Sequence, residues 1–136
     1  MPTLDELNER GVGTLPGLIG LTILEAEEGK ISSHLDLREE LMAPNGYLHA
    51  ATVVAIADTS CGYGTFVNLP EGAQSFTTIE LKSNFVGTKC GGAIGCEAKL
   101  VHGGRTTQVW DATVSDEESS KPIALFRCTQ MILYPR

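Results

Sequence analysis

The stretch from Asn45 to Val67 constrains the fold of this chain more than any other. It follows Pro44 and opens with Asn45-Gly46, a turn signal, because proline presets φ while asparagine and glycine tolerate positive φ. From about His49 to about Thr65 the residues are small or apolar on nearly every side, and none is proline. A helix of that composition is usually buried all round. The sequence therefore predicts one long helix at the centre of the structure.

Asp58 interrupts this apolar helix near its middle. Burying a carboxylate without partners costs several kcal/mol or more, so the group needs hydrogen bonds, a shifted pKa or a chemical role. Two interpretations follow. Asp58 is either a catalytic group or a structural side chain bonded to neighbouring backbone.

The composition favours one soluble, globular domain over residues 1–136, with 42% hydrophobic and 20% charged residues. A net charge of −7 argues against general binding of nucleic acid. No apolar run approaches the roughly 20 residues of a membrane span, and the first residues lack the pattern of a signal peptide. We therefore expect a cytoplasmic protein with no membrane partner.

The four cysteines, Cys61, Cys90, Cys96 and Cys128, form no CxxC pair and have no histidine spaced to complete a zinc site. We expect no metal and mainly buried, reduced thiols. Cys61 lies near Asp58 in sequence and is a second candidate nucleophile, although no activating partner is evident.

The pattern around the helix predicts an α+β fold. Thr3 caps a short helix that ends at Gly11 and Gly13, and the central helix is expected to fade at Gly62 and Gly64. The six expected strands are Leu18–Glu27, Lys30–Leu37, Ser75–Val86, Ala93–Val101, Arg105–Val114 and Ile123–Tyr134. Their short turns favour an antiparallel sheet packed against the central helix.

Strict alternation along Ser75–Val86 predicts which side chains share a face of that strand. Thr77, Ile79, Leu81 and Phe85 are expected on one face, and Thr78, Glu80, Lys82 and Asn84 on the other. His102-Gly103-Gly104 lies between two expected strands, so we interpret it as a hairpin turn.

A six-stranded antiparallel sheet wrapped round one long apolar helix resembles the hotdog fold. Asn45-Gly46, His49 and Asp58 nine residues later resemble the signature of acyl-CoA thioesterases of the phenylacetate-pathway type. The pattern Thr78-x-Glu80-Leu81-x-x-Asn84-Phe85 and the triplet Gly103-Gly104-Arg105 fit the same family. One departure is Ala50-Ala51, where the family usually has two glycines after the histidine.

The resemblance implies hydrolysis of an acyl-CoA, which in this family includes aromatic ones, to a free acid and coenzyme A without a bound cofactor. Asp58 would be the nucleophile or the general base. The Ala50 N–H in the first helical turn is the candidate oxyanion donor, because negative charge develops on the carbonyl oxygen there. Asn45 would orient the water or the carbonyl, His49 would hold the thioester oxygen or its loop, and Thr78 would donate a hydrogen bond to Asp58.

The substrate would also contact Gly46, and Lys89 and Arg105 are candidates for the phosphates of coenzyme A. Each polar candidate has a structural alternative: His49 as a helix cap, Asn45 as a turn residue, Thr78 as an ordinary strand residue, and the two cations as solvated surface charges. The alternative function is a non-catalytic hotdog module that binds acyl-CoA or an acyl carrier protein.

The spacing of His49 and Asp58 predicts that the site needs two chains. Nine residues at roughly 100° each place them on opposite sides of the helix, about 13 Å apart along its axis. Two such helices, antiparallel about a two-fold axis, would bring Asp58 of one chain near the helix start of the other. We therefore expect at least a homodimer, and the resemblance implies a homotetramer.

Overall fold

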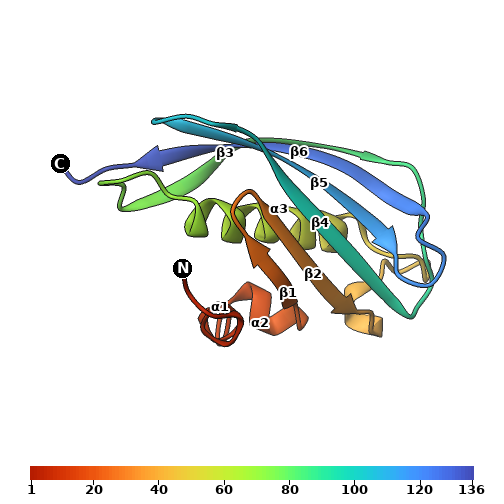
Figure 1. The fold of residues 1–136 in the computed structure, drawn as a ribbon. Helices are drawn as coiled ribbons and strands as arrows, with labels where there is room; N and C mark the ends of the chain where they lie inside the picture. The colour runs from red at the N-terminus through yellow and green to blue at the C-terminus, as the bar shows by residue number, and fades with distance from the viewer.

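The computed structural model describes residues 1–136 as a curved antiparallel sheet wrapped round one helix (Figure 1). The helices are α1 (Leu4–Arg10), α2 (Leu15–Ile19) and α3 (Ala50–Val67), with a 3₁₀ turn at Glu39–Leu41. The strands are β1 (Thr22–Glu27), β2 (Lys30–Asp36), β3 (Ser75–Phe85), β4 (Ala93–Gly103), β5 (Thr107–Asp116) and β6 (Pro122–Leu133). They lie in the order β1-β2-β4-β5-β6-β3, so β1 and β3 are the two edges.

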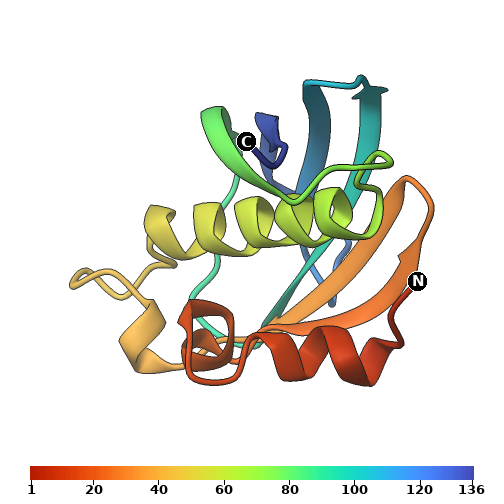
Figure 2. The same cartoon turned by 90° about the vertical axis from the view of Figure 1, so that its left-hand side faces the viewer.

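Helix α3 lies against the concave face of the sheet and contacts all six strands, as the sequence predicts. The turned view shows α1 and α2 beneath α3, where they cover the side turned away from β3 (Figure 2). A core of 23 buried residues includes side chains of α1, α3 and all strands except β3. None of the helices combines the length and the hydropathy that crossing a bilayer requires.

The central helix runs three residues past Gly64 instead of ending there. A Cβ atom at Gly64 would lie 2.5 Å from the ring of Trp110, which is fully buried on β5. A glycine inside a helix costs about 1 kcal/mol relative to alanine. Here the missing side chain lets the helix approach Trp110, so packing overrides the local tendency of glycine to end a helix.

The predicted strand Leu18–Glu27 is wrong over its first residues, which belong to α2. Pro16 occupies the first turn of this helix, where its missing N–H costs nothing, and Gly20 ends it in the left-handed conformation. Strand β1 begins only at Thr22. From sequence this apolar run indicates a strand, because five helical residues are too few to show a 3.6-residue period.

A β-bulge corrects the predicted faces of β3. The register shifts between Thr78 and Glu80, so Ile79 has no partner on β6. Thr78 pairs with the buried Gln130, and Phe85 pairs with the buried Ala124, which lies on the same face of β6. Thr78 and Phe85 therefore both face α3, although they are seven residues apart, because the bulge reverses the alternation.

Candidate active site

Asp58 points from the middle of α3 toward the inner face of β3. Its Oδ1 accepts a hydrogen bond of 3.0 Å from Thr78 Oγ1, and Oδ2 has no partner within the chain. Desolvation by burial raises the pKa of Asp58, and the Thr78 hydrogen bond opposes that rise in pKa. The expected contact between these two residues is therefore present, and it leaves one carboxylate oxygen free for chemistry.

The hydroxyl of Thr78 has a second neighbour. Its Oγ1 also lies 3.0 Å from Oε1 of Gln130, a fully buried side chain on β6. Sequence reasoning missed Gln130. The signal was there, because a glutamine interrupts the inward-facing series Ala124, Phe126, Cys128 and Ile132 on an otherwise apolar face.

The start of α3 presents an unused hydrogen-bond donor. Ala50 is the first helical residue, and its N–H donates to no acceptor in the chain. The next N–H, that of Ala51, donates to His49 Nδ1 at 2.9 Å. Ala50 has an ordinary negative φ, so the alanine is tolerated in place of the family's glycine. The free N–H and the helix dipole together suit a developing negative charge.

His49 caps the helix, which is the structural role that the sequence offers for it. The capping hydrogen bond also determines which ring nitrogen carries the proton. Because Nδ1 accepts from the backbone, the neutral imidazole carries its proton on Nε2. The His49 side chain is exposed. Its Nε2–H is thus a second donor beside the Ala50 N–H, so capping and substrate binding are compatible roles.

An apolar cleft of about 220 Å³ opens at this helix start. Its lining comes from α3 and the residue two before it, from the end of β3 and the loop that follows, and from the start of β6: Leu48, Ala50, Val53, Phe85, Gly87, Thr88 and Ile123. Asn45 lies outside this cleft, where its Oδ1 accepts from the Tyr47 N–H in a turn. Gly46 adopts positive φ in the same turn and borders a separate cleft.

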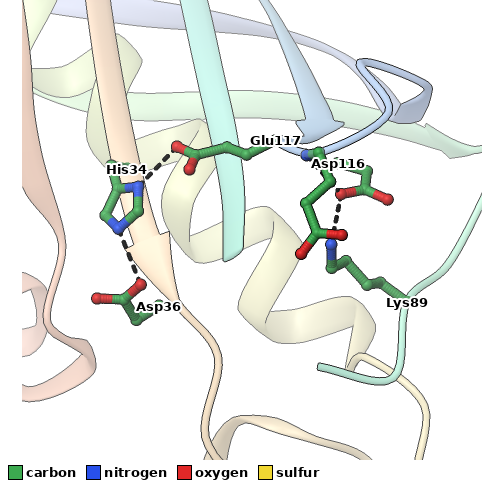
Figure 3. Close-up of polar contacts among 6 residues, drawn as sticks. His34, Asp36, Lys89, Asp116 and Glu117 are labelled. Atoms are coloured by element: carbon green, nitrogen blue, oxygen red, sulfur yellow. Dashed lines mark hydrogen bonds and ion pairs between the residues drawn. The ribbon is translucent and has the colours of Figure 1, made fainter. Parts of the chain in front are cut away.

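Lys89 is engaged elsewhere. Its side chain is only 11% exposed, and its ammonium group pairs with Asp116. Figure 3 shows the pair beside His34, Asp36 and Glu117. The Lys89 hydrogen bond lowers the pKa of Asp116. The Lys89 carbonyl oxygen accepts from the Leu48 N–H at 2.9 Å. Lys89 therefore holds the loop against the helix start and is a poor ligand for coenzyme A phosphates.

Arg105 lies at the other end of α3, in the turn between β4 and β5. Its guanidinium stacks on the ring of Tyr134 at 4.8 Å and is exposed. Gly103 ends β4 just before this turn, which agrees with the predicted hairpin. Arg105 and the helix start are separated by the length of α3, so one chain does not bring them together.

The alternative nucleophile Cys61 is a fully buried residue of α3 itself. The neighbouring Cys128 thiol and burial raise its pKa well above the usual value. Burial also raises the pKa of Cys96 to about 12. A nucleophilic cysteine needs a thiolate, so the structure argues against Cys61. All four cysteines are free, and only Cys90 is exposed.

A six-stranded antiparallel sheet that encloses one long helix is the architecture of the hotdog fold. Residues 45–123 match the model of the family described as the thioesterase superfamily. A 1,4-dihydroxy-2-naphthoyl-CoA hydrolase of Listeria monocytogenes is 31% identical over 111 residues, which cover 82% of this chain and 89% of the relative. The chain belongs to the thioesterase superfamily.

Solved structures agree with this assignment. A thioesterase from Haemophilus influenzae superposes with a TM-score of 0.92 at 25% identity, covering 98% of this chain and 92% of that one. A mutant thioesterase from Pseudomonas aeruginosa gives a TM-score of 0.91 at 22% identity, over 98% and 95% of the two chains. The expected hotdog fold is confirmed, and the protein is a thioester hydrolase.

Proposed function

We propose that this protein hydrolyses an aromatic acyl-CoA, with Asp58 as the general base that activates water. The observation that carries the proposal is the half-buried Asp58 carboxylate, whose Oδ2 is unpartnered while Oδ1 is held by Thr78. Burial raises the pKa of Asp58, which makes the carboxylate a stronger base. The Ala50 N–H and the His49 Nε2–H would stabilise the oxyanion.

The cleft at the helix start supports an aromatic substrate. An apolar cavity of about 150 Å³ accommodates benzene, and this cleft of about 220 Å³ is lined by Leu48, Val53, Phe85 and Ile123. The Listeria relative is named for a naphthoyl thioester. Both observations favour an aryl group over a long straight chain, which would need a deeper cavity.

A second chain would complete the site. The outer edge of β3 pairs with no strand, and Ile79, Leu81, Phe85 and Val86 expose large apolar side chains along it. An exposed apolar edge strand is a surface for pairing with another strand. A copy related by a two-fold axis would add its β3 antiparallel and place its Asp58 near this chain's helix start. Two-chain sites and a tetramer remain predictions.

The same arrangement keeps Arg105 as a candidate for the phosphates. In an antiparallel pair of α3 helices, the C-terminal end of one lies on the side of the other's N-terminus. Arg105 of one copy would thus lie toward the helix start of the other.

The test is thiol release from a panel of benzoyl-, naphthoyl-, hexanoyl- and palmitoyl-CoA, with wild type and Asp58→Asn. The carboxamide cannot accept a proton, so we expect kcat to fall by about 100-fold or more. Wild-type activity should be highest on the aryl thioesters. Unchanged turnover by Asp58→Asn would refute the role of Asp58, and preference for palmitoyl-CoA would refute the aromatic substrate.

Single turnover in ¹⁸O-labelled water separates the base from the nucleophile. A general base places the label in the product acid. A nucleophilic Asp58 expels the thiolate and forms a mixed anhydride, and attack of water on its Asp58 carbonyl carbon places the label in the Asp58 carboxylate while an original Asp58 oxygen leaves with the acid. Label in Asp58 would overturn the assignment of the base while leaving the thioesterase activity intact.

A further inference from the structure

Thr78 faces two acceptor oxygens with one proton. Its Oγ1 lies 3.0 Å from both Asp58 Oδ1 and Gln130 Oε1. A hydroxyl group donates one hydrogen bond and accepts others, so it cannot serve both oxygens as a donor. The ionised carboxylate is the stronger acceptor, since charge-assisted hydrogen bonds are roughly twice as strong as neutral ones. The Thr78 proton therefore belongs to Asp58.

Gln130 is then left with a buried oxygen facing the lone pairs of Thr78. The two ends of a side-chain amide have the same shape, and hydrogen bonding decides between its two orientations. Turned by 180°, the Gln130 amide donates from Nε2 to Thr78 Oγ1. Its oxygen then faces the Cys128 thiol, which lies at 3.5 Å and can donate an S–H. This orientation gives the amide nitrogen a donor role toward Thr78 and the amide oxygen a donor partner in Cys128.

We propose that Gln130 is a positioning residue, whose amide donates to Thr78 Oγ1 and thereby commits the single Thr78 proton to the Asp58 carboxylate. The row runs from the Cys128 thiol through Gln130 and Thr78 to Asp58. Each donor points the same way, so the hydrogen bonds polarise one another. Its effect on catalysis rests on the proposed role of Asp58 as the base.

The pairing of β3 with β6 places the residues of this row next to one another. Thr78 and Gln130 are direct partners on β3 and β6, and the bulge at Ile79 lies immediately after Thr78. Gln130 is completely buried, where an amide without hydrogen-bond partners would destabilise the fold. An apolar residue at this position would fill the core without the cost of desolvating an amide. The retained amide thus has a use beyond packing.

The chain offers a matched control in Gln108. It is Gln130's cross-strand neighbour on β5 and is equally buried. Its amide donates to the Asn68 carbonyl oxygen and accepts from Trp110 Nε1, without contacting Thr78. Gln108→Met therefore removes a buried amide from the same core while leaving the row to Asp58 intact.

The experiment compares Gln130→Met, Gln108→Met, Thr78→Val and the double variant Thr78→Val/Gln130→Met. The pKa of Asp58 is measured by ¹³C NMR of labelled aspartate, assigned with Asp58→Asn, and the acid limb of kcat/KM is measured in parallel. We expect Gln130→Met to raise the Asp58 pKa and to lower kcat/KM at the acid end by about threefold or more, with the alkaline plateau retained. Gln108→Met should leave both unchanged.

The double variant isolates the path of the effect. If Gln130 acts through Thr78, adding Gln130→Met to Thr78→Val should change the Asp58 pKa no further. An unchanged pKa in Gln130→Met, an equal rise in Gln108→Met, or an additive double variant would each overturn the proposal. If Asp58→Asn retains activity while Gln130→Met still moves the pKa, the proposed function fails and the hydrogen-bond row stands.

A measurement without a core substitution keeps the proposal testable if Gln130→Met does not fold. In the wild type, the ¹⁵N signal of the Gln130 side-chain amide should follow the titration of Asp58. In Thr78→Val it should not, because the connecting hydroxyl is absent. A Gln130 signal that is insensitive to pH in the wild type would contradict the row.

Discussion

Asp58 is the residue at which the fold and the chemistry conflict. It occupies a helix position surrounded by small and apolar side chains, and one hydrogen bond from Thr78 only partly offsets its desolvation. A structural carboxylate would satisfy both oxygens. The sequence predicted both this conflict and the Thr78 contact, because an acid in an apolar helix and a threonine on the following strand are visible without a structure.

At this scale we predict that Asp58→Asn is more stable than wild type at neutral pH. The folded pKa of Asp58 is raised, so its favourable contribution is complete below the ordinary aspartate pKa and is lost as pH rises through the folded pKa. The carboxamide avoids that loss. Thermal unfolding should show a midpoint about 3 °C higher at pH 7 and no difference near pH 4. A lower midpoint at pH 7 would show that the ionised carboxylate stabilises the fold.

The first turn of helix α3 supplies the candidate oxyanion donor. Only one N–H of that turn is unused, because His49 Nδ1 holds the Ala51 N–H and the His49 carbonyl oxygen accepts from Thr52. The remaining donor, Ala50, borders the apolar cleft. Sequence predicted this donor from the position of the helix start. The cap that orients His49 depended on the backbone conformation there, which no sequence pattern specified.

Ala50→Pro tests the oxyanion donor without breaking the helix. Proline is favoured at the first helical position, and His49 already has the extended backbone that a residue before proline prefers. We expect the unfolding midpoint to be nearly unchanged and kcat to fall by about 100-fold. Stopped-flow or steady-state thiol release measures kcat. Ala50→Gly retains the N–H and should stay active, and full activity in Ala50→Pro would exclude this donor.

At the scale of the whole molecule, the two halves of the candidate site lie apart within one chain. Strand β3 is an unpaired edge, and Asp58 and the helix start of one chain lie about 12 Å apart along α3. A single copy cannot place one thioester against both. We therefore predict that a second copy of the chain supplies the other half of the site.

Mixing two inactive variants tests this assembly. In a hybrid of Asp58→Asn and Ala50→Pro, one of the two composite sites contains both an intact Asp58 and an intact helix start. Random pairing of co-expressed chains should restore about a quarter of the wild-type activity per subunit. A partner carrying both substitutions should restore none. No recovery in the hybrid would place the whole site within one chain.

The sequence by itself determined the local chemistry: the buried helix with its acid, the turn before it, and the succession of strands along the chain. These depend on periodicity and on residues close together in the chain. Only the tertiary structure decided the bulge that brings Thr78 and Phe85 onto one face of β3, the fit of Gly64 against Trp110 and the engagement of Lys89 by Asp116. Each of these depends on contacts between residues that are distant in sequence, and such contacts form only when the chain packs.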